Sequence, residues 1–110
     1  MTYKYVQAFP TAALGAGNNT VYTVPTSAGV AQIRSAKVHN PTAAIIVFEL
    51  HVVAPAGSSA STNQIIKRSI AVNETYMCPE LLNMTLITGN FLVAVGQTLN
   101  FELSVAEVVQ

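Results

Sequence analysis

The sequence predicts an all-β protein: a single antiparallel β-sandwich, jelly-roll-like, with an extended N-terminal arm. The β-branched residues Val, Ile and Thr, which favour strands over helices, occupy 14, 7 and 11 of the 110 positions. Turn-forming Gly, Pro and Asn residues recur at short intervals. Two segments, 44–53 and 99–105, alternate side chains with the period of two typical of a half-buried strand. Short strands between evenly spaced turns indicate a sandwich or barrel, and the length suits one domain.

The first 19 residues lack a convincing periodic pattern and contain Pro10, Gly15 and Gly17. We therefore expect residues 1–19 to form an arm outside the regular strands and residues 20–110 to form the sandwich domain. An apolar, aromatic arm is expected to dock on a partner, for example by adding a strand to a neighbouring sheet. Its candidate partner-binding residues are Tyr3, Tyr5, Val6 and Phe9.

Strands are expected at 20–24, which ends before a proline, and at 33–39. Alternation in the second segment breaks between Ile33 and Ala36, which indicates a β-bulge. Counted along the chain, Arg34 and Lys37 fall on opposite faces.

The strand expected at 44–53 has apolar residues at every even position, which predicts that this set is buried. The odd positions mix Ile45 and Val47 with the polar Glu49 and His51. We expect Ile45 and Val47 to be covered, for example by a second copy of the chain, and we count them as candidate partner-binding residues. The small residues of 54–62 that follow predict an exposed, flexible loop.

The second half of the chain predicts strands at 64–72, 75–77, 91–95 and 99–105, with one helical turn at 79–84. In 64–72, Ile66, Ile70 and Val72 share a face with Arg68. In 99–105 the alternation is uninterrupted, so one face is predicted to be buried. That face carries Leu99, Phe101, Leu103 and Val105.

The composition argues against several classes of function. Charged residues make up 9% of the chain, there is no Asp, and the formal net charge is zero. Disorder, nucleic-acid binding and attraction to anionic membranes all need more charge than this. We find no secretory signal and no apolar run long enough to cross a bilayer, so synthesis in the cytoplasm is expected. A near-neutral, apolar chain is expected to assemble, as a homodimer or homotrimer.

The residues offer little for chemistry, and we expect no catalytic, cofactor-binding or metal site and no enzymatic activity. The glycines at 15 and 17 are followed by a β-branched run, not by the helix that a phosphate-binding loop needs. Glu49 and His51 share a strand face, but tetrahedral zinc needs further ligands unless a symmetry axis brings copies together. Cys78 has apolar neighbours and is expected to be a small buried residue.

Five segments in order resemble short virion proteins of tailed bacteriophages, namely head-decoration, cement and tail-associated β-sandwich proteins. They are TVYTVP at 20–25, AQIRSAKVHN at 31–40, LHVVAPAG at 50–57, NQII at 63–66 and IAVNETY at 70–76. The resemblance covers residues 20–108, and the N-terminal arm precedes it. Such proteins often carry Gly-Asp before a late strand, where this chain has Gly89-Asn90.

The resemblance implies a structural virion protein, closest in length and composition to cement proteins on the capsid exterior. Its implied partner is the major capsid protein of the same virus, and it would stabilise contacts between capsid subunits. A tail, baseplate or head–tail connector component is the alternative. A more distant one is a carbohydrate- or receptor-binding sandwich that uses the loop at 54–62.

Overall fold

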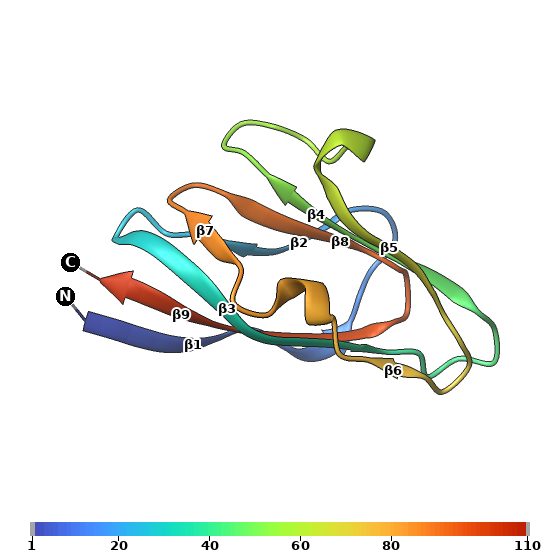
Figure 1. Ribbon diagram of the computed structural model, residues 1–110. Helices are drawn as coiled ribbons and strands as arrows, with labels where there is room; N and C mark the ends of the chain where they lie inside the picture. The colour runs from blue at the N-terminus through green and yellow to red at the C-terminus, as the bar shows by residue number, and fades with distance from the viewer. Residues whose placement is uncertain (1, 110) are drawn as a thin grey trace.

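The computed structural model describes residues 2–109, which form two antiparallel β-sheets packed face to face (Figure 1). Sheet A has the order β1 (Thr2–Ala13), β9 (Asn100–Val109), β3 (Ala28–His39) and β6 (Thr75–Tyr76), and β7 (Thr85–Ile87) also pairs with β3. Sheet B has the order β2 (Asn19–Thr23), β8 (Phe91–Val95), β4 (Ile46–Val53) and β5 (Gln64–Ile70). Two single 3-10 turns, η1 (Ser61–Asn63) and η2 (Pro79–Leu81), complete the described chain.

The chain wraps as a jelly roll. Strands β1, β3 and β9 lie in sheet A, whereas β2, β4 and β8 lie in sheet B, so the chain repeatedly crosses between the sheets. Strands β6 and β7 both pair with β3 and together fill one strand position. This confirms the all-β sandwich that the turn spacing predicts. No helix within residues 2–109 is long and apolar enough to cross a membrane.

The core lies between the sheets and is centred on Phe101 of β9. The Phe101 ring centroid is 5.8 Å from the ring centroids of both Phe48 and Phe9. The predicted face of β9 is fully buried, and the predicted face of β4 packs against the core, although Ile46 and Val52 are only partly buried. The fully buried residues on these two faces are Phe48, Leu50, Phe101, Leu103 and Val105. Ala44 is exposed, because β4 begins only at Ile46.

The prediction that the first residues lie outside the regular strands is wrong. Residues 2–13 form β1, which pairs with β9 and is an edge strand of sheet A. Register shifts between Val6 and Phe9, and again between Phe9 and Ala12, interrupt the alternation that would have revealed a strand. Val6 and Phe9 are partly buried and pack against the core. Sheet A therefore extends into the segment expected to be an arm.

Most of the remaining elements are of the predicted type but begin or end at different residues. The bulge expected in β3 is confirmed as a register shift between Ile33 and Ser35. Strand β5 ends at Ile70, so Val72 lies beyond it and is exposed. Strand β7 was not predicted, since three residues are too few to show a period. Strand β9 continues past the predicted end at Val105 to Val109.

Replacing Phe101 with Ala is expected to lower the free energy of unfolding by about 3–5 kcal/mol, because the cavity removes contacts with two other rings. The control Met77→Ala removes an exposed apolar side chain and is expected to change the free energy of unfolding by less than about 0.5 kcal/mol. Urea denaturation measures both. Equal effects would show that the core is not centred on this ring.

Candidate functional site on the outer face of sheet A

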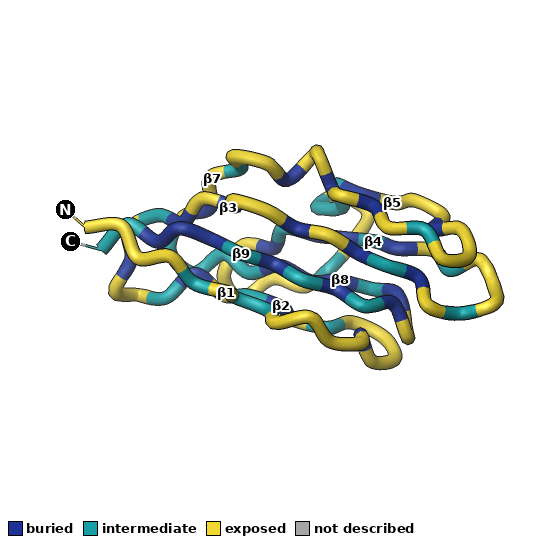
Figure 2. The backbone as a smooth tube through the Cα atoms, turned by 90° about the horizontal axis from the view of Figure 1, so that it is seen from below, coloured by how far each residue is buried: buried dark blue, intermediate teal, exposed yellow. Residues whose placement is uncertain are grey.

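Two exposed tyrosines and one arginine meet in a depression on the outer face of sheet A. Tyr3 and Tyr5 are 58% and 66% exposed, and they lie on β1, the exposed edge strand visible beside β9 and β3 in Figure 2. The depression has a volume of about 390 Å³. Its lining residues are Tyr3, Tyr5, Gln32, Arg34, Asn83 and Ala106.

Strand register explains why these residues meet. Tyr5 of β1 pairs with Ala106 of β9, which in turn pairs with Gln32 of β3, so the three form one row across the sheet. The central residue of that row is an alanine, whose short side chain leaves the space between its larger neighbours open. On the far side, Asn83 joins the sheet because its N–H donates to the Ile33 carbonyl.

Arg34 lies at the β3 bulge and lines this space. Ile33 pairs with Val105 and Ser35 with Ser104, so Arg34 is the extra residue without an opposite partner. Its guanidinium carbon lies 4.5 Å from the centroid of the Tyr5 ring, a cation–π contact that spans β9. The bulge also corrects the prediction that Arg34 and Lys37 point to opposite faces, because the extra residue puts Lys37 on the outer face too.

The other end of the same face is a satisfied polar cluster. Glu102 of β9 accepts hydrogen bonds from the Gln7 amide at 3.3 Å and the Thr11 hydroxyl at 3.1 Å. Its other carboxylate oxygen lies 3.5 Å from the Lys37 ammonium. Two flanking strands therefore neutralise the charge of Glu102 and complete its hydrogen bonding.

Two carboxylates are engaged by tyrosines elsewhere in the molecule. The Tyr22 hydroxyl donates to buried Glu107 at 2.6 Å, and burial together with this carboxylate raises the pKa of Tyr22 well above its usual value. The Tyr76 hydroxyl donates to Glu80 at 2.6 Å. The Arg68 guanidinium covers the Tyr76 ring at 4.3 Å and lies 3.7 Å from Glu74. Because Arg68 lies on β5 of sheet B and Tyr76 on β6 of sheet A, this contact connects the two sheets.

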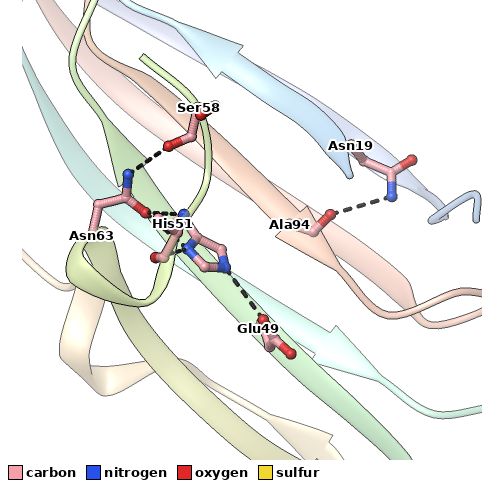
Figure 3. A network of polar contacts seen from close by, with 7 residues as sticks. Asn19, Glu49, His51, Ser58, Asn63 and Ala94 are labelled. Carbon is pink, nitrogen blue, oxygen red and sulfur yellow. Dashed lines mark hydrogen bonds and ion pairs between the residues drawn. The ribbon is translucent and has the colours of Figure 1, made fainter. Parts of the chain in front are cut away.

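The loop expected to be free instead folds back over the outer face of sheet B and is tied to His51 (Figure 3). Asn63 accepts from the Ala60 N–H at 2.9 Å and donates to the Ser58 carbonyl at 2.9 Å, which fixes its amide orientation. Its Oδ1 and the Ala60 carbonyl both face His51 Nδ1, at 2.9 and 3.0 Å. Since both are acceptors, Nδ1 carries the proton, and Nε2 faces Glu49 at 3.3 Å.

Glu49 and His51 thus share a face, as predicted, and His51 is buried beneath the loop. Residues 2–109 contain no group of three His, Cys, Asp or Glu side chains placed to hold a metal ion. Cys78 is fully buried, and burial raises the pKa of its thiol to about 12. The prediction of a small buried residue at this position is confirmed.

The structure separates the six predicted partner-binding residues into three groups. Tyr3 and Tyr5 line the depression, whereas Val6 and Phe9 pack inward against the core. Ile45 immediately precedes β4 and Val47 is its second residue, and their side chains are 66% and 44% exposed.

Sequence reasoning missed Arg34, Gln32 and Asn83 as members of the site. The available signal was the broken alternation after Ile33, which indicates the bulge but not the direction in which Arg34 points.

No family model matches the chain, and no curated protein and no solved structure is significantly similar to it.

Tyr76 is expected to make stability depend on pH in the alkaline range. Burial, and then the Glu80 carboxylate, raise the pKa of Tyr76 to about 12 from an unfolded value of 10.0. The fold favours the protonated phenol, so its contribution is complete below about pH 10 and is lost as the pH rises towards about 12. Chemical denaturation across this range should show the loss in the wild type and a smaller loss in Tyr76→Phe. Identical profiles would contradict the assignment.

Asn63→Ala is expected to release the loop from His51 and to lower the free energy of unfolding by about 1–3 kcal/mol, since buried polar groups lose their partners. Hydrogen exchange should become faster at residues 54–63 and stay unchanged in β9. Ser59→Ala, which removes a side chain with no hydrogen bond among the described residues, is the matched control.

Proposed function

We propose that this protein is a structural component of a tailed-bacteriophage virion and acts as a capsid cement or decoration protein. In this role it binds the major capsid protein on the exterior of the assembled head and stabilises contacts between capsid subunits. The proposal joins the sequence resemblance to one structural observation, the exposed aromatic pair on the edge strand β1.

The first part of β1 has the properties of a docking strand. From Thr2 to Val6 it pairs with β9 in regular register, and no strand within residues 2–109 pairs with its outer side. Soluble monomers usually protect such edges with bulges, prolines or charges. Here both bulges and Pro10 fall in the second part of the strand. The regular part carries one charge, Lys4, and presents the exposed side chains of Tyr3 and Tyr5. Tyrosine is a frequent anchor residue at protein interfaces.

A docking surface of this kind would stabilise the capsid by binding only to assembled subunits. A ligand that binds only the assembled state stabilises that state by mass action. Contacts of modest strength become effective when one protein, or an oligomer of it, bridges several subunits. Ile45 and Val47 supply a second exposed apolar surface on sheet B, which we assign to contact between copies of this chain.

The test is to count copies of the chain per major capsid subunit in purified particles by quantitative mass spectrometry. A simple ratio on the order of one copy per capsid subunit is the expected result. A ring-sized number, on the order of ten copies per particle, would instead assign the protein to the tail, baseplate or connector. Absence from particles would contradict a virion role.

The Tyr3→Ala/Tyr5→Ala double variant tests the docking strand. It is expected to fold, because both side chains are exposed, but to lose at least about tenfold in affinity for heads that lack the protein. Met77→Ala, which truncates another exposed apolar side chain, is the control and should bind as the wild type does. Equal binding of all three proteins would remove β1 from the interface.

A further inference from the structure

Arg34 is the arginine whose guanidinium has no carboxylate partner within residues 2–109. All five glutamates of the chain already contact a side chain elsewhere: Glu49 contacts His51, Glu74 contacts Arg68, Glu80 contacts Tyr76, Glu102 contacts Lys37, and Glu107 contacts Tyr22. Arg68, the other arginine, has both an aromatic and an acidic partner, whereas Arg34 has only the aromatic one. Within residues 2–109 every glutamate is already engaged, so a carboxylate that pairs with Arg34 would come from another molecule.

The stacking contact brings the Arg34 charge to the edge of the sheet. Arg34 belongs to β3, two strands inside the sheet, yet its guanidinium lies over the ring of Tyr5 on the edge strand β1. A strand added to the outer side of β1 would lie about 4.8 Å from it. A Glu or Asp side chain on that strand, on the face of Tyr5, would lie beside the ring that the guanidinium contacts.

The lining of the depression has the matching charge. Arg34 is the one charged residue among its six lining residues, and Tyr3, Tyr5 and Ala106 supply apolar surface around it. Because a guanidinium is always protonated and presents paired N–H donors, it favours a carboxylate over a neutral amide.

We propose that the outer edge of β1 takes an extended segment of a partner protein as an added strand, and that Arg34 binds a Glu or Asp carboxylate of that segment. The inference rests on the proposed function in one respect, namely that a partner protein docks on β1. It adds the chemistry of recognition: backbone pairing along the edge, and one acidic side chain placed beside Tyr5.

The experiment titrates the ¹⁵N-labelled full chain with two blocked pentapeptides, Thr-Val-Glu-Val-Thr and its Thr-Val-Gln-Val-Thr counterpart, followed by NMR. The Glu peptide is expected to shift the signals of Tyr3, Tyr5 and the Arg34 side chain, and to bind about fivefold more tightly than the Gln peptide. This preference should shrink with added salt. Absence of binding, or equal affinity for both peptides, overturns the proposal.

Two variants assign the preference to one cation. Arg34→Gln is expected to abolish the preference for the Glu peptide. Lys37→Gln removes a cation on the same face that already has a carboxylate partner, and should keep the preference. The same preference in wild type and Arg34→Gln, or its loss in Lys37→Gln alone, overturns the assignment to Arg34.

Two N-methylated forms of the Glu peptide test strand addition. One is methylated on the odd-numbered backbone nitrogens and the other on the even-numbered ones. One of the two forms should lose binding, because the N–H groups of a paired strand point alternately towards and away from its neighbour. Unchanged binding of both forms overturns the added strand.

These outcomes are separate from the particle count. A protein that prefers the Glu peptide but is absent from virions keeps the acidic docking site and loses the capsid role. A protein present in virions that binds both peptides equally keeps the role and loses the acidic partner.

Discussion

Strand β9 lies between β1 and β3, and both the core and the candidate site depend on how its two faces are filled. Its inner face carries Phe101, Leu103 and Val105, which are fully buried against sheet B. On its outer face the small Ala106 separates Tyr5 from Gln32 and leaves room for the Arg34 side chain to cross the strand. One face of β9 thus contributes to the packed core, and its other face forms the floor of the depression. A larger residue in place of Ala106 would fill the depression without touching the core.

The parts of the fold that could be predicted are those where alternation runs without interruption. Strand β8 has the predicted bounds. The four residues predicted to be buried in 99–105 are all fully buried. Strand β1 escaped because its two register shifts each change which face the following residues occupy. Only Val6, Ala8 and Phe9 of β1 pack against the core, and the other residues of the strand are exposed. A periodic signal requires one consistently buried face, and this strand has none.

The candidate site was predictable in part. Tyr3 and Tyr5 could be recognised as aromatic residues in a segment with no obvious core role. Arg34 could not, because its contact with Tyr5 depends on β9 lying between β1 and β3. Gln32 and Asn83 lie far from the tyrosines in sequence, and they meet them only after β3, β9 and β1 are placed side by side. The loop over His51 is a similar case. Its small residues suggest mobility, whereas hydrogen bonds from His51 Nδ1 to Asn63 and Ala60 hold it in place.

The described chain begins and ends at the same end of sheet A, where Thr2 pairs with Val109 (Figure 1). Tyr3 and Ala106, which line the depression, lie close to this pair. A tag or domain fused to either terminus would therefore lie close to Tyr3 and to the outer edge of β1. The loop over His51 lies on the outer face of sheet B, on the opposite side of the sandwich, and most of its residues are exposed. An engineered insertion there would project away from β1, which makes this loop a better position than either terminus for inserting a foreign sequence.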